Sequence, residues 1–146
     1  MQVIKNVRKL LPTAPKADER TEEQKAASRR SRTSRARGRG FEKSTACDIR
    51  DALGAHPEDV KRTPAAIGGK DIVLHHALRP RFPFHVECKN CKTLQVPAWI
   101  KQAEDGATKE NAGLEPIVVF KLVGNGKKYV IVAFDYFLEK VCKEPK

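Results

Sequence analysis

The chain has 146 residues, a length typical of a single domain. Its 29 basic and 18 acidic residues give a net charge of +11, which favours a polyanionic partner, nucleic acid before membrane. Apolar runs are too short for a membrane span, and Lys5, Arg8 and Lys9 interrupt any secretory signal. The four cysteines are therefore expected to be reduced thiols in a cytoplasm, the host's if the protein is viral.

The positive charge is concentrated at the start of the chain. Residues 1–40 carry twelve basic and four acidic side chains, so +8 of the total charge lies there. We predict that residues 1–37 form a basic arm, a short amphipathic helix over 2–11 followed by flexible polar chain, and that 38–146 form the domain. The arm either solubilises the protein or, together with Arg39 just after it, lies along DNA phosphates through six arginines, Arg29, Arg30, Arg32, Arg35, Arg37 and Arg39.

Periodicity predicts an α/β domain after the arm. In chain order, we expect a helix over 41–54, strands over 59–63, 71–74 and 84–89, a helix over 97–111, strands over 116–123 and 129–133, and a short helix capped by Asp135. Pro97 suits the first turn of the second helix. Asn125-Gly126 predicts a tight hairpin turn between the last two strands.

The strand over 84–89 carries polar residues on one face. Because strand side chains alternate, Val86 and Cys88 are expected to face the core, and His85, Glu87 and Lys89 the opposite side. A carboxylate and an ammonium group two residues apart often form only a surface ion pair. The pattern needs another acidic residue before it indicates catalysis.

Asp71 and Glu42 supply further acidic residues. Asp71 opens the preceding strand, and antiparallel pairing would bring it beside Glu87. Two close carboxylates repel each other, and a hard divalent cation relieves that repulsion, with the backbone carbonyl of Cys88 as a further ligand. Glu42 shares a helix face with apolar residues, so it is either a buried carboxylate with a partner or an exposed first-turn acid that favours the helix dipole.

These residues resemble the PD-(D/E)xK nucleases, and among them the Holliday junction resolvase-like enzymes of archaea and phages. The resemblance covers roughly residues 38–142, and Lys70 stands where the superfamily name implies proline. The matching segments are Gly38-Arg39-Gly40-Phe41-Glu42, Lys61-Arg62-Thr63-Pro64, Gly69-Lys70-Asp71-Ile72, Val86-Glu87-Cys88-Lys89, Trp99-x-x-Gln102-Ala103 and the hairpin around Asn125-Gly126.

The resemblance implies a restriction-endonuclease-like αβββαβ core, with a mixed sheet flanked by helices, and a role for each matching residue. Asp71, Glu87 and the Cys88 carbonyl would bind Mg²⁺, with Mn²⁺ as a substitute, and Glu42 would complete the site directly or through water. Lys89 would orient or activate the attacking water, with Gln102 supporting it or contacting the backbone. Arg62 and Lys70 would contact DNA.

The implied reaction is hydrolysis of phosphodiester bonds in branched or duplex DNA. A resolvase would act as a homodimer, because a four-way junction needs paired cuts. Within the superfamily, the alternatives are a restriction-like enzyme and a repair or recombination nuclease. A non-catalytic nucleic-acid-binding protein would also explain the basic arm, but it has no reason to place carboxylates near bound phosphates.

Other motifs are weaker. Cys88-x-x-Cys91, with His75, His76 and His85 nearby, invites a zinc site, but no second cysteine pair exists and Cys88 is expected in the core. The His85-x-Glu87 pattern lacks the Pro-Cys-x-x-Cys segment of zinc deaminases, so we reject that class. His85 is interpreted as a bystander or a phosphate contact, and Trp99 as a core residue rather than a base-stacking one.

Overall fold

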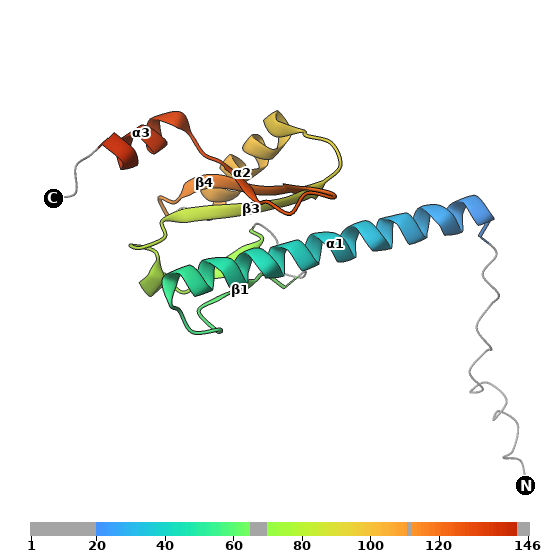
Figure 1. The fold of residues 1–146 in the computed structure, drawn as a ribbon, viewed down its shortest axis with the longest axis horizontal. Coiled ribbons are helices and arrows are strands. Elements are labelled where there is room, and N and C mark those ends of the chain that lie inside the picture. The colour runs from blue at the N-terminus through green and yellow to red at the C-terminus, as the bar shows by residue number, and fades with distance from the viewer. Residues whose placement is uncertain (1–19, 65–69, 111, 143–146) are drawn as a thin grey trace, which may run out of the picture. The chain divides into compact units, whose positions relative to one another are not determined.

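The computed structural model describes residues 20–64, 70–110 and 112–142. The elements are α1 (Glu22–Leu53), β1 (Val60–Arg62), β2 (Ile72–Leu74), a 3₁₀ helix η1 (His76–Leu78), β3 (Phe84–Cys91), α2 (Val96–Glu110), β4 (Glu115–Leu122), β5 (Tyr129–Ile131) and α3 (Phe134–Cys142) (Figure 1). The chain divides into two compact units, Met1–Arg32 and Thr33–Lys146. The helix predicted over 2–11 lies outside the described residues.

None of the described helices has the length and apolar character needed to cross a membrane.

Helix α1 begins at Glu22, so the part of the predicted flexible arm from residue 22 to residue 37 is helical instead. A capping box starts the helix: the Gln24 N–H donates to the Thr21 hydroxyl, and the Thr21 N–H donates to the Gln24 side chain. The following residues are mostly arginine, alanine, serine, glutamate and lysine, several of them strong helix formers. The absence of large apolar side chains suggested disorder, but capping and propensity favour a helix here.

The second unit contains two small sheets. Strand β4 pairs in parallel with β3, from Phe84↔Glu115 to Cys91↔Leu122, and antiparallel with β5. Strands β1 and β2 form a separate antiparallel pair. The predicted α/β class is therefore confirmed: a mixed three-stranded sheet with helices, compatible with a restriction-endonuclease-like core.

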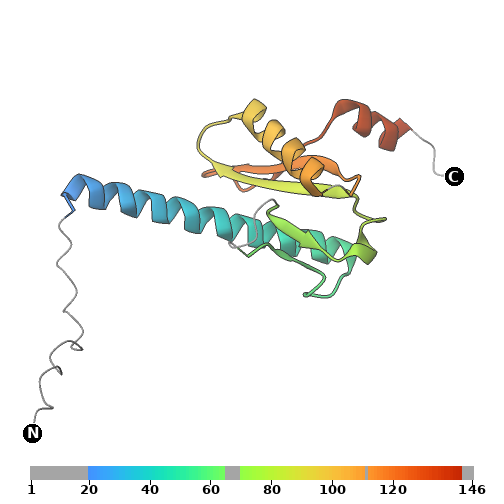
Figure 2. The ribbon, with the colours of Figure 1, turned by 180° about the vertical axis from the view of Figure 1, so that it is seen from behind.

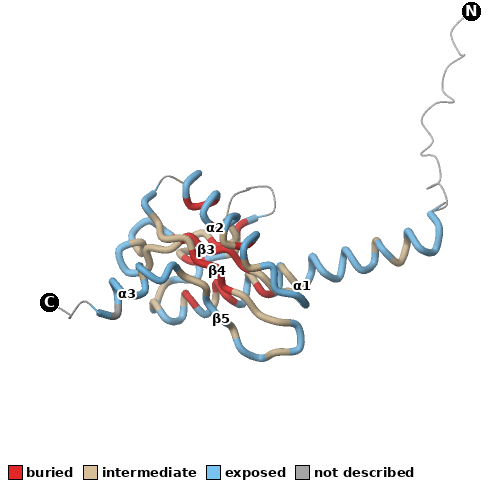
Figure 3. Tube along the Cα trace, turned by 90° about the horizontal axis from the view of Figure 1, so that it is seen from above, coloured by how far each residue is buried: buried red, intermediate tan, exposed pale blue. Residues whose placement is uncertain are grey.

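Helices α1 and α2 cover opposite faces of this sheet (Figures 1 and 2). The register explains how, because residues on β3 and β4 alternate between the two sides. On one face, the sheet residues Val86, Cys88, Ile117 and Val119 pack against Phe41, Ala46 and Ile49 of α1. On the other face, Val118 packs against Trp99 and Ala103 of α2. Burial is concentrated in β3 and β4 (Figure 3), and the prediction that Trp99 is a core residue is confirmed by its 5% exposure.

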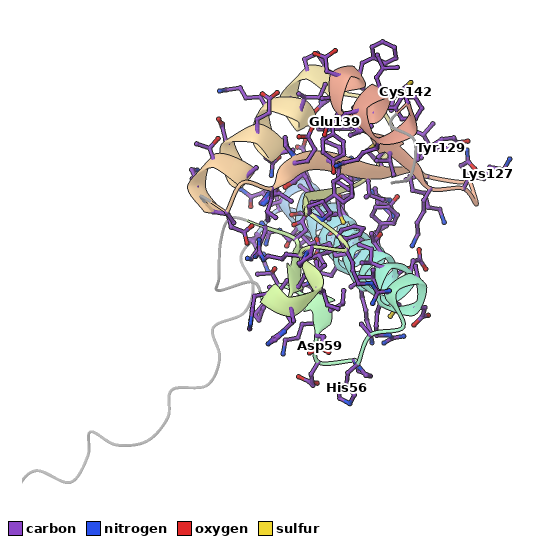
Figure 4. The ribbon with its side chains drawn as sticks, turned by 90° about the vertical axis from the view of Figure 1, so that its left-hand side faces the viewer. His56, Asp59, Lys127, Tyr129, Glu139 and Cys142 are labelled. Carbon is purple, nitrogen blue, oxygen red and sulfur yellow. The ribbon has the colours of Figure 1, made fainter. Side chains whose placement is uncertain are left out.

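The β4–β5 hairpin forms as predicted, but its turn is wider than a two-residue Asn125-Gly126 turn. The positive φ of 87° falls on Gly124, and the Asn125 side chain accepts the Lys127 N–H at 2.9 Å. Figure 4 labels the exposed side chains of Lys127 and Tyr129 at this end of the hairpin.

Candidate active site

A cleft of about 610 Å³ brings together residues from α1, β1, β3, α2 and the segment before β2. Its lining holds three carboxylates that the sequence singled out, Glu42, Asp71 and Glu87. The remaining lining residues are Arg62, Thr63, Pro64, Lys70, Ala98, Lys101, Gln102, Asp105, Gly106 and Lys109. The cleft is therefore rich in charge of both signs.

Asp71 lies against β3, but not through the strand pairing predicted from the sequence. Strand β2 pairs with β1, and within the described residues it forms no ladder with β3. Instead, the Cys88 N–H donates a 2.7 Å hydrogen bond to Oδ2 of Asp71. The predicted pairing is wrong, because β2 makes its backbone hydrogen bonds to β1 and an aspartate side chain occupies this point of the β3 edge.

The carboxylates of Asp71 and Glu87 interact electrostatically. Burial and, after it, the Glu87 carboxylate raise the pKa of Asp71 to about 6, although the hydrogen bond from the Cys88 N–H opposes the rise. Glu87 itself is only 4% exposed. A half-buried and a buried carboxylate in this arrangement favour binding of a cation that offsets their charge.

The donor set fits a hard divalent cation. Asp71 Oδ1, Glu87 Oε2 and Glu42 Oε1 accept no hydrogen bond from the described part of the chain. Magnesium prefers such oxygens and keeps several water ligands. Within the same residues, no three His, Cys, Asp or Glu side chains come together as a metal-binding group. A cation would therefore need main-chain oxygen or water ligands beside Asp71 and Glu87.

Lys89 is held between two acceptors. Its Nζ lies 2.5 Å from Glu87 Oε1 and 2.8 Å from Gln102 Oε1. The predicted alternation along β3 is thus confirmed: Glu87 and Lys89 face α2, while Val86 and Cys88 lie in the core on the other side. The two contacts fix the ammonium group beside the carboxylates.

Glu42 lies inside α1 rather than in its first turn, so an interaction with the helix N-terminus does not explain it. Its Oε2 accepts a 2.6 Å hydrogen bond from Nε of Arg62, and its side chain is 18% exposed. Of the two interpretations left open by the sequence, the structure favours the carboxylate with a partner, although Glu42 is half-buried and not fully buried. Arg62, expected to contact phosphate, is the partner and also lines the cleft.

A second charged cluster, missed by the sequence reasoning, lies at the end of α2. Glu110 Oε1 accepts hydrogen bonds from Lys70, at 2.5 Å, and from Arg79, and Oε2 lies 3.1 Å from Nδ1 of His85. Burial opposes ionisation of Glu110, but these partners outweigh it and lower its pKa to about 2. His85 is 1% exposed, so its interpretation as a phosphate contact is wrong.

The sequence contained signals for these residues. Glu110 continues the apolar face of α2 that carries Trp99 and Ala103, and a carboxylate on such a face needs a partner. Lys101 and Lys109 are eight residues apart on the face that presents Gln102 to the cleft.

Cys88 and Cys91 lie on opposite faces of the sheet. Cys88 packs in the core with α1, while Cys91 packs near Trp99 of α2. Burial raises the pKa of the Cys88 thiol, which keeps it protonated. The two sulfur atoms therefore do not face a common ligand.

A comparison with protein families agrees with this geometry. A family model described as phage putative PDDEXK endonuclease matches residues 33–145. No curated protein and no solved structure matches the chain. The matched region includes the whole cleft and well over half of the sequence. The chain therefore belongs to the phage PDDEXK endonuclease family, within the PD-(D/E)xK nuclease superfamily.

Proposed function

We propose that the protein is a divalent-metal-dependent endonuclease that hydrolyses DNA phosphodiester bonds in the cleft. The observation that carries this proposal is the convergence of Asp71, Glu87 and Lys89, which come from the segment before β2 and from β3. A protein that only bound DNA would gain nothing from buried carboxylates at a phosphate-binding surface, because like charges repel.

The residues divide the chemistry between them. Asp71, Glu87 and the main-chain carbonyl of Cys88 would hold Mg²⁺ or Mn²⁺, and Glu42, already paired with Arg62, would act through water. When bound, the metal polarises the phosphate and lowers the pKa of a water molecule. Lys89 is held by Glu87 and Gln102, so its ammonium group can orient that water and stabilise the extra negative charge of the transition state.

Cleavage of labelled DNA tests the proposal. The protein is incubated with Mg²⁺, Mn²⁺ or a chelator, alongside Asp71→Ala, Glu87→Ala and the control Glu104→Gln, an exposed acid of α2 outside the cleft. We expect metal-dependent cutting by the wild type and the control. The two alanine variants should bind DNA without cutting it. Robust cutting by either alanine variant, or by the wild type in chelator, would overturn the assignment.

We further propose that the preferred substrate is a four-way junction, cut symmetrically by a homodimer. This rests on the resemblance of the motifs to resolvase-like enzymes and on the two-fold symmetry that paired cuts require. The same assay therefore includes a junction, a linear duplex and a single strand, with light scattering to weigh the bound complex. Equal cutting of duplex and junction would indicate a restriction-like, repair or recombination nuclease instead.

A further inference from the structure

Lys70 links the proposed metal site to the cluster at the end of α2. It is the residue immediately before Asp71, and its Nζ lies 2.5 Å from Oε1 of Glu110. On the other side, Oε2 of Glu110 contacts His85 of β3, two residues before Glu87. The Glu110 carboxylate thus contacts one residue close before Asp71 and one close before Glu87, the two proposed metal-binding acids.

Asp71 needs such an anchor because its own segment is weakly attached to β3. Strand β2 has three residues and pairs with β1, in a sheet separate from that of β3. Among the described residues, the polar link from Asp71 to β3 is the hydrogen bond to Cys88, which uses an oxygen of the carboxylate itself. A link through the neighbouring residue leaves the other carboxylate oxygen available to a metal.

The anchor is well fixed at its own end. Glu110 is the last residue of α2, its side chain is 15% exposed, and it is held by Arg79 and His85 as well as by Lys70. His85 is almost fully buried. Ion pairs shielded from water in this way hold their geometry better than exposed pairs.

We propose that Glu110 is a positioning residue, which acts through Lys70 to hold Asp71 at the distance from Glu87 that a divalent cation requires. This inference rests on the proposed metal site. Partners that orient metal ligands typically change metal affinity by about 10- to 100-fold when they are removed.

Arg79 provides a matched control. Lys70 and Arg79 donate to the same oxygen of Glu110, and each side chain is 25% exposed. Replacing either with alanine removes one positive charge and leaves Glu110 two partners. Only Lys70 adjoins Asp71 in the chain. If charge alone mattered, both variants would bind a cation at least as tightly as the wild type, because a nearby positive charge has been removed.

The test is Mn²⁺ binding measured by calorimetry without DNA, with thermal unfolding measured in parallel. We expect Lys70→Ala to weaken Mn²⁺ binding by about 10-fold or more, and Arg79→Ala to change it by less than about threefold. The two variants should lose similar thermal stability. Omitting DNA removes any effect of Lys70 on phosphate contacts.

A second comparison addresses Glu110 itself. Glu110→Gln should weaken Mn²⁺ binding in the wild type but add little in the Lys70→Ala background, because the link is already broken there. Should Glu110→Gln fail to fold, the Mn²⁺ affinities of Lys70→Ala and Arg79→Ala still test whether Lys70 positions Asp71. Equal Mn²⁺ affinity for Lys70→Ala and Arg79→Ala would overturn the positioning role while leaving the nuclease proposal intact. A wild-type protein that binds no Mn²⁺ would overturn both.

Discussion

The main-chain N–H of Cys88 holds the carboxylate of Asp71 at a distance of 2.7 Å. Cys88 is the residue between Glu87 and Lys89. The hydrogen bond therefore places the Asp71 carboxylate next to the part of β3 that carries the Glu87 and Lys89 side chains. It also partly offsets the cost of burying the charge, although burial and the Glu87 carboxylate still raise the pKa of Asp71 to about 6.

The raised pKa gives a prediction for stability without metal. A carboxyl group with a higher pKa in the folded state stabilises the protein at low pH, and this contribution is lost as the pH rises through about 6. Asn cannot ionise, so Asp71→Asn should unfold at a higher temperature than the wild type near pH 8, by an amount worth up to ~2–3 kcal/mol. Below about pH 4 the two proteins should converge, because the wild-type group is then protonated.

Bound metal should reverse the order of thermal stability of the wild type and Asp71→Asn. Protons and Mn²⁺ compete for Asp71, so Mn²⁺ affinity and cleavage by the wild type should rise with pH through about 6, and added Mn²⁺ should stabilise the wild type but not Asp71→Asn. Thermal unfolding across a pH series, with Mn²⁺ and with chelator, measures both effects. A metal-free wild type as stable as Asp71→Asn near pH 8 would show that burial and the Glu87 carboxylate do not raise the pKa of Asp71.

A second prediction concerns Lys89 and the residue that holds it. Lys89→Ala should reduce the cleavage rate by about 10²-fold or more, since an ammonium group at the reacting phosphate stabilises the transition state. Gln102→Ala leaves the ammonium in place but removes one of its two acceptors, so we expect a smaller loss, about 10-fold. Single-turnover cleavage measures both, with Lys92→Ala, an exposed lysine outside the cleft, as control. A near-normal rate for Lys89→Ala would show that the Glu87–Lys89 ion pair has only a structural role.

Local pattern predicted most of the elements, because hydrophobic periodicity reflects burial. The face of β3 that carries Glu87 and Lys89 followed from strand alternation alone. The start of α1 was misjudged because a solvated helix has no apolar stripe, so only the capping box around Thr21 marks it. Contacts between distant segments were harder. Strand pairing was predicted to bring Asp71 to β3, whereas its side chain makes the contact. Hydrophobic periodicity does not show which strand β2 pairs with.

A third prediction concerns the two lysines of α2 that line the cleft. Lys101 and Lys109 are exposed and lie on the face of Gln102, where DNA phosphates on either side of the reacting one would pass. Replacing both with alanine should weaken DNA binding regardless of sequence and reduce the slope of log affinity against log salt by about 2. The control replaces Lys61 and Lys127, which are exposed outside the cleft. Equal slopes for the two double variants would place the DNA elsewhere.

The last prediction concerns the arginines near the start of α1. Because residues 29–39 are helical, their guanidinium groups are carried by ordered backbone, and binding DNA does not require that backbone to fold. If the six arginines neutralise about six phosphates, they should contribute about −5 to the slope of log affinity against log salt, a loss of roughly 10³-fold between about 50 and 200 mM.

Four exposed arginines provide the variant, replaced by glutamine to preserve helix propensity: Arg30, Arg32, Arg35 and Arg39. The slope should become shallower by about 3 to 4, since each neutralised phosphate contributes about 0.9. A charge-matched variant replaces four exposed lysines outside the cleft, Lys61, Lys92, Lys127 and Lys140, and should keep the wild-type slope.

Phosphate contacts carry no sequence information, so affinity for junction and duplex should fall alike. Cleavage at saturating enzyme should persist, because these arginines lie outside the cleft lining. Equal slopes for the two variants would leave these arginines the role of keeping the protein soluble.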